Sequence, residues 1–104
     1  MRMTYKDDEG KVALLNTEED ETIMSTEWIY GRQQSRWQEI LVHETKGGKR
    51  IFYTADYSRW QGEPYCIINV IDDIQDWLVD NLQLLNQKQV DRLAELGVKV
   101  EETA

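Results

Sequence analysis

Alternating apolar and polar residues predict β-strands in the first third of the chain. Met3 and Tyr5 alternate with polar neighbours, residues 7–10 are turn-forming, and an apolar run follows at 12–15. These segments are expected to pair as a hairpin. An acidic connection at 18–21 then leads to a predicted third strand. The side chains expected on one side of that strand are Met24, Thr26, Trp28 and Tyr30.

The pattern at residues 36–46 permits a helix or a strand. Ser35-Arg36-Trp37-Gln38 has the form of a helix capping box, and Trp37 and Ile40 lie at helical spacing. The Gly47-Gly48 pair is instead typical of a hairpin turn, and the runs on both sides of it are rich in β-forming residues. We favour two strands joined by this turn.

A two-residue turn at Gly47-Gly48 also predicts which residues face each other. Val42 then lies opposite Tyr53, which is a favourable cross-strand pair. Glu39 lies opposite Asp56, and because two carboxylates repel each other, the hairpin is expected to bend or end there.

The remaining segments predict one more strand and two helices. Residues 65–71 are nearly continuously apolar, which is typical of a central strand buried on both faces. From Asp72 the apolar residues recur about every 3.6 residues, which predicts a first helix. A second helix is expected between a cap at Asn86 and a stop at Gly97. The residues predicted to face inward are Ile74, Trp77, Leu78, Leu82, Leu85, Val90, Leu93 and Ala94.

These elements predict a single α+β domain over residues 1–104. Its antiparallel sheet of hairpins has about four to six strands and is followed by two short C-terminal helices packed on one face. A length of 104 residues suits one domain, and 40% hydrophobic residues with four tryptophans argue for a folded core.

The chain is strongly acidic, with a formal net charge of −8 at pH 7. Residues 1–52 hold ten acids and eight bases, whereas residues 53–104 hold ten acids and four bases, so the second half contributes most of the charge. Such a field repels nucleic acid and membrane surfaces and attracts basic partners. We therefore expect a basic protein partner and no membrane partner.

The densest acids form a predicted row on the first helix. Asp72, Asp76 and Asp80 are four residues apart with Asp73 beside them, so a helix that begins at Asp72 carries them on its solvent side. This row, together with the loop residue Trp60, is the candidate partner-binding surface. In its most specific form the hypothesis is a nucleic-acid mimic that inhibits or regulates a basic protein.

Each part of this surface has an ordinary structural alternative. The acids suit the solvated face of an amphipathic helix, and a loop tryptophan such as Trp60 is expected to fold back onto the core as a lid. No metal or other cofactor is expected, because no glycine-bearing loop surrounds the acids.

A small thiol enzyme is the hypothesis from a different class. Cys66 and His43 are the only cysteine and histidine, so they are the only nucleophile–base pair available. Cys66 lies in an apolar strand, where burial raises the pKa of a thiol and makes it inert. We therefore assign no catalytic residue and expect that the domain is not an enzyme.

Basic residues support a third hypothesis, a nucleic-acid binder. Arg32 and Arg36 lie close together in the sequence, and Lys46, Lys49 and Arg50 crowd the predicted hairpin tip. The negative net charge argues against this hypothesis, since nonspecific affinity comes from neutralising phosphates.

The sequence also bears on where the protein works. No signal sequence is recognised at the N-terminus, no apolar run is long enough to span a bilayer, and the single cysteine forms no intrachain disulfide. A cytoplasmic location is the expectation. Nothing in the pattern indicates an oligomeric state.

Residues 37–82 resemble a loosely defined group of small bacterial proteins from phage and mobile elements. The resemblance rests on Trp37-Gln38-Glu39-Ile40-Leu41, the Thr45-Lys46-Gly47-Gly48-Lys49 turn, Phe52-Tyr53 and Asp76-Trp77-Leu78. It implies a hairpin followed by a helix and a mobile-element origin. It implies no activity and no site residue.

Overall fold

The strands of the described residues form two separate hairpins and one four-stranded sheet. The structure, a computed structural model, describes residues 1–100. The strands are β1 (Arg2–Lys6), β2 (Val12–Asn16), β3 (Glu21–Ser25), β4 (Trp28–Ile29), β5 (Arg32–Gln33), β6 (Arg36–Glu44), β7 (Arg50–Ser58) and β8 (Cys66–Val70). They form a β1–β2 hairpin, a β4–β5 hairpin and a four-stranded sheet in the order β3-β6-β7-β8. All of these pairs are antiparallel.

The helices follow the strands along the chain, which confirms the predicted α+β class. They are α1 (Ile74–Asn81), the 3-10 turn η1 (Leu82–Leu84) and α2 (Gln87–Glu95). Asp73 caps α1, Asn86 and Gln89 form a capping box on α2, and Gly97 with φ +91° follows the end of α2. None of the helices within residues 1–100 has the length and apolar character needed to cross a membrane.

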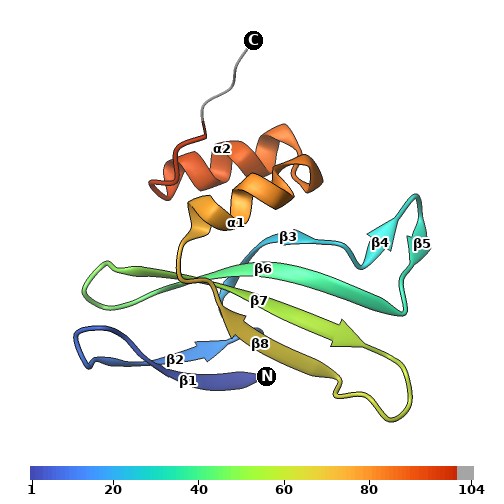
Figure 1. Cartoon of the computed structure of the whole chain (residues 1–104), viewed down its shortest axis with the longest axis horizontal. Coiled ribbons are helices and arrows are strands. Elements are labelled where there is room, and N and C mark those ends of the chain that lie inside the picture. Colours follow the sequence, from blue (N-terminus) through green and yellow to red (C-terminus); the bar gives the residue numbers. More distant parts are fainter. Residues whose placement is uncertain (101–104) are drawn as a thin grey trace.

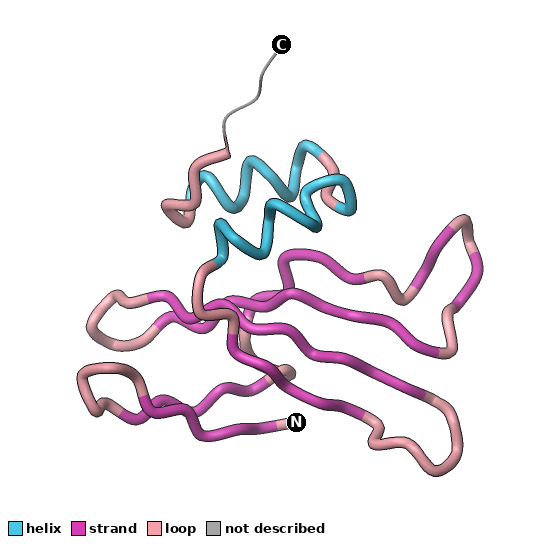
Figure 2. Tube along the Cα trace, in the orientation of Figure 1, coloured by secondary structure: helices cyan, strands magenta, loops and turns pink. Residues whose placement is uncertain are grey.

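The four-stranded sheet is the middle of three layers (Figures 1 and 2). The β1–β2 hairpin covers one face and the two helices cover the other. The hairpin-side core consists of Leu15, Leu41, Ile51, Tyr53, Ala55, Cys66 and Ile68. The helix-side core consists of Ile23, Val42, Phe52, Leu78, Leu93, Leu96 and Val98. Side chains alternate between the two cores along β6 and β7, which is why both strands contribute to both.

The inward face of the helices is largely as predicted. Leu78 and Leu93 are buried in the helix-side core. The residues that pack partly buried against this core include Ile74, Trp77, Leu82 and Leu85. Val90 is half-buried, whereas Ala94 is exposed, so the prediction that Ala94 faces inward is wrong.

The strand interpretation of residues 36–46 is confirmed, but the predicted register is wrong by one residue. Val42 lies opposite Phe52, and Glu39 lies opposite Ala55. The reason is the turn: Thr45 and Lys49 are joined by a backbone hydrogen bond, and Gly48 with φ +85° completes a three-residue loop. The expected repulsion between Glu39 and Asp56 therefore does not arise.

Two other strand predictions need correction. Residues 65–71 were predicted to form a central strand, but β8 is an edge strand whose Cys66 and Ile68 are buried while Ile67 is exposed. The predicted third strand ends at Ser25. The chain then forms the β4–β5 hairpin, in which Tyr30 (φ 52°) and Gly31 (φ 76°) make a tight turn of positive φ.

Candidate functional site

The four aspartates of the predicted acidic row do not lie in one row. Asp72 precedes α1, and the Asp73 side chain accepts hydrogen bonds from the backbone N–H groups of Gln75 and Asp76. The helix therefore begins two residues later than predicted, because its first turn needs this cap. Asp76 and Asp80 remain as an exposed pair one turn apart on α1.

Trp60 lies apart from the start of α1. It stands in the loop before β8, whereas Asp72 follows β8, so a five-residue strand of roughly 17 Å separates them. The Trp60 side chain is 57% exposed, and the prediction that it covers the core is wrong. The guanidinium of Arg36 lies 5.3 Å from its ring centroid and holds the indole in the loop.

Cys66 and His43 occupy opposite ends of the sheet. Cys66 lies opposite Tyr57 and His43 lies opposite Ile51, so the two positions are six residues, or roughly 20 Å, apart along β7. Cys66 is buried, as predicted, and this burial raises the pKa of its thiol. The structure therefore does not assemble a thiol–imidazole pair from these residues.

The basic residues are also divided between the two ends of the sheet. Arg32 and Arg36 lie near the start of β6, and the 45–49 turn lies at its other end. Arg36 pairs with Glu63, Lys49 with Asp7, and Arg50 with Glu44. Most of this positive charge is thus matched by local carboxylates.

A groove of about 490 Å³ lies on the helix-side face of the sheet, at the end away from the β6–β7 turn. Its floor is made by Gln38, Asp56 and Ile67, which stand side by side on β6, β7 and β8. Its remaining lining comes from the segments at this end of the sheet: Thr26, Arg36, Trp37, Tyr57, Ser58, Glu63 and Pro64.

Asp56 is the charged group on the floor of the groove. The side-chain amide of Gln38 donates to one of its carboxylate oxygens at 2.9 Å, and that of Asn69 donates to the other at 3.5 Å. Both donors are neutral. No lysine, arginine or histidine within residues 1–100 forms an ion pair with Asp56. Asp56 therefore presents an unneutralised carboxylate to the groove.

Large apolar side chains are exposed at the same end of the molecule. We call this surface the aromatic end, and it comprises Trp28, Ile29, Tyr30, Trp60 and Ile67. Figure 1 shows the β4–β5 hairpin that carries the first three of them rising from the sheet on the side of the helices. An ion pair between Glu27 and Arg59 ties the base of this hairpin to the loop of Trp60.

Sequence reasoning missed most of this end. Trp28 and Tyr30 were predicted to lie on one side of a third strand, yet Tyr30 is fully exposed at a hairpin tip. The available signal was Gly31, because a turn that needs positive φ is best formed with glycine. Asp56 was considered only as a source of repulsion, since its partners Gln38 and Asn69 depend on the true register.

Sequence reasoning also missed the partner of His43. Its Nδ1 lies 2.8 Å from a carboxylate oxygen of Asp20, which the sequence places within an acidic connection. His43 lines a second and larger cavity, between the β1–β2 and β6–β7 turns.

Comparison with known proteins adds no assignment to this geometry. The resemblance of residues 37–82 to proteins of phage and mobile elements thus stays a prediction. No protein-family model matches the chain, and neither the curated proteins nor the solved structures contain a match to it.

Proposed function

We propose that the domain is a non-catalytic interaction protein that docks a basic segment of a partner protein at the aromatic end. The observation that carries the proposal is Asp56, a half-buried carboxylate held by two neutral amides on the floor of an open groove. A lysine or arginine of the partner would supply the missing positive charge there.

The charge of the groove supports a basic occupant. The charged residues of its lining are Asp56, Glu63 and Arg36, and Arg36 is engaged by Glu63. This contact lowers the pKa of Glu63, so the Glu63 carboxylate is ionised at neutral pH and balances Arg36. One negative charge therefore remains, and the net charge of −8 adds a long-range attraction for a basic surface.

The apolar surroundings support a protein as the partner. Tryptophan, tyrosine and arginine are the residues most enriched among those that dominate binding energy at protein interfaces. Trp28, Tyr30 and Trp60 are exposed here although the chain has two well-filled cores to bury apolar groups. A partner that covers the aromatic end would remove this apolar surface from water.

The test measures where a basic segment binds. The ¹⁵N-labelled full chain is titrated with a short capped peptide that has a central arginine, and with the same peptide carrying glutamine instead. The arginine peptide is expected to shift the amide resonances of Gln38, Asp56 and Ile67 in a saturable way. The glutamine peptide is expected to leave them nearly unchanged. Equal responses to both peptides would remove the charge argument.

The partner itself is then isolated on the immobilised domain, identified, purified and measured with variants. Asp56→Asn keeps the shape of the side chain but removes its charge, and it is expected to weaken binding about tenfold. Trp60→Ala is expected to weaken binding about thirtyfold. The matched control is Asp76→Asn with Asp80→Asn on α1, which removes more charge elsewhere on the surface.

The control pair also separates the two candidate surfaces. Loss of binding in the α1 variant, with Asp56→Asn unaffected, would place the partner on the acidic helix and favour the nucleic-acid mimic. That result would overturn docking in the groove.

A further inference from the structure

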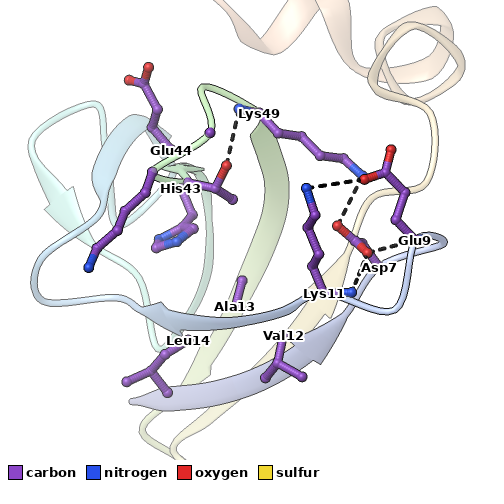
Figure 3. A pocket seen from close by; sticks show the side chains of 12 residues that line it. Asp7, Glu9, Lys11, Val12, Ala13, Leu14, His43, Glu44 and Lys49 are labelled. Atoms are coloured by element: carbon purple, nitrogen blue, oxygen red, sulfur yellow. Dashed lines mark hydrogen bonds and ion pairs between the residues drawn. The ribbon is translucent and has the colours of Figure 1, made fainter.

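A cavity of about 740 Å³ lies between the β1–β2 turn and the β6–β7 turn. Figure 3 shows it from close by: Lys11 and Lys49 stand near Asp7 on one side, and His43 and Glu44 lie on the other. Val12, Ala13 and Leu14 of β2 add an apolar part to the lining. This size and mixture of apolar and polar groups are typical of small-molecule sites.

His43 is held in this lining by a hydrogen-bond network. Asp20 accepts from the Tyr53 hydroxyl at 2.6 Å, from the Asn16 backbone N–H at 2.9 Å, and bonds to His43 Nδ1 at 2.8 Å. Tyr53 is fully buried, and the Asp20 side chain is 10% exposed. The carboxylate therefore fixes the imidazole ring and has Nδ1–H as its donor.

The other ring nitrogen of His43 is free to meet a ligand. Nε2 has no hydrogen-bond partner among residues 1–100. Nε2 can donate to an anion only when both ring nitrogens carry a proton, and the Asp20 carboxylate beside Nδ1 is then the counter-charge on the far side of the ring.

The Asp7 carboxylate of the cavity is already engaged by neighbouring groups of the protein. Both oxygens of Asp7 are occupied, one by the backbone N–H groups of Glu9 and Lys11 and the other by the Lys49 ammonium at 3.4 Å. Because these contacts outweigh the effect of burial, the pKa of Asp7 is lowered and the group stays ionised.

The other two acids of the lining also have cationic neighbours. Glu9 lies 3.5 Å from Lys11, and Glu44 lies 3.9 Å from Arg50. Lys46, which also lines the cavity, forms no ion pair within the part of the chain that the structure describes. Each ammonium has three N–H donors, so Lys11, Lys46 and Lys49 together keep donors that no acid of the cavity uses.

We propose that this cavity binds a small molecule with an oxyanion, a carboxylate or a phosphate, attached to an apolar body. His43 Nε2 and the Lys46 ammonium hold the anion, and the Val12–Leu14 segment contacts the apolar body. The site lies at the end of the sheet opposite the aromatic end, so it stands independently of the docking proposal.

The single histidine makes the test direct, because its ring resonances need no assignment. The ¹⁵N-labelled full chain is titrated with phenyl phosphate and with benzoate at constant ionic strength, while the His43 ring nitrogens are observed by NMR. At least one probe is expected to shift the Nε2 signal in a saturable way. The tighter of the two probes decides between a phosphate and a carboxylate ligand.

Variants decide whether the cavity holds the probe. Lys46 lies in an exposed turn. Lys46→Ala is expected to weaken binding of the tighter probe about tenfold, because one charge-assisted hydrogen bond to the anion is lost. Asp20→Asn removes the carboxylate that fixes the His43 ring and is expected to reduce the Nε2 shift. Lys88→Ala on α2 removes the same charge away from the cavity and is expected to leave binding unchanged.

Two results would overturn the proposal. One is a shift of the His43 Nε2 resonance that increases linearly with the concentration of both probes and never saturates, which indicates nonspecific association of anions with the surface. The other is equal weakening by Lys46→Ala and Lys88→Ala, which indicates general attraction to positive charge.

Discussion

Arg92 and Glu21 form a two-point ion pair that joins helix α2 to the edge strand β3. The Nε and Nη2 groups of Arg92 donate to the two carboxylate oxygens of Glu21 at 2.7 and 2.6 Å. Glu95 accepts from the remaining Nη1 at 2.9 Å. The contact is the polar link between the helix layer and the edge of the sheet, and the hydrogen bond from Arg92 lowers the pKa of Glu21.

Glu21→Gln is expected to lower the free energy of unfolding at neutral pH by less than about 1 kcal/mol, because the pair is partly exposed to solvent. Because the pKa of Glu21 is lower in the folded state, the stabilisation is present above the ordinary glutamate value of 4.5. It is lost as the pH falls through the lowered folded-state pKa. Urea unfolding across this pH range measures both effects, with the exposed Glu19→Gln as control.

Gly47 and Gly48 are expected to respond differently to alanine. Gly48 has φ +85°, so Gly48→Ala is expected to cost about 1 kcal/mol of stability. At Gly47 an added Cβ meets only Thr45 Oγ1 at an ordinary 3.9 Å, so Gly47→Ala is expected to stay within about 0.5 kcal/mol of the parent. Denaturant unfolding of the two variants checks the turn, and equal costs would contradict the three-residue loop.

Asp72 and Asp73 provide a similar pair at the start of α1. Asp73→Ala removes the cap of two backbone N–H groups and is expected to cost about 1 kcal/mol. Asp72→Ala removes the same charge from the position before it and is expected to change stability by less than about 0.5 kcal/mol. Thermal unfolding compares the two, and a larger loss for Asp72 would move the helix start to the residue predicted from the sequence.

Cys66 is expected to be unreactive in the folded protein. It is 7% exposed, and burial raises the pKa of its thiol, so little thiolate is available at neutral pH. A thiol reagent monitored by absorbance should label it fully in urea and only very slowly without urea. Rapid labelling of the folded chain would reopen the hypothesis of a thiol enzyme.

The sequence predicted where strands and helices lie along the chain better than it predicted the order of the strands in the sheet. The apolar run at residues 65–71 indicates that its side chains can be buried, and Cys66 and Ile68 are indeed buried. The run does not indicate how many strands pair with this one in the sheet. Ile67 is exposed because β8 is an edge strand and neither helix covers Ile67. Central position depends on the pairing of all the strands, which no single segment encodes.

The candidate sites were harder to predict because each depends on register. Asp20 meets His43 because β3 pairs with β6 so that Glu21 lies opposite Val42. Locally, Asp20 is one of four consecutive acids with nothing to distinguish it. Likewise, Asp56 meets Gln38 only after the 45–49 turn takes its observed length. If the length of a turn is predicted wrongly by one residue, every cross-strand pair is predicted wrongly, and a site formed by such a pair is missed.

The β6–β7 hairpin gives the chain a natural order of folding events. Its nine residue pairs close over a three-residue loop, so little chain entropy is lost before contacts form, and its residues supply both cores. Val42→Ala is therefore expected to slow refolding. Leu93→Ala is expected mainly to speed unfolding, because we expect α2 to dock after the hairpin has formed. Stopped-flow kinetics measures both rates, and the reverse pattern would show that the helices assemble before the sheet.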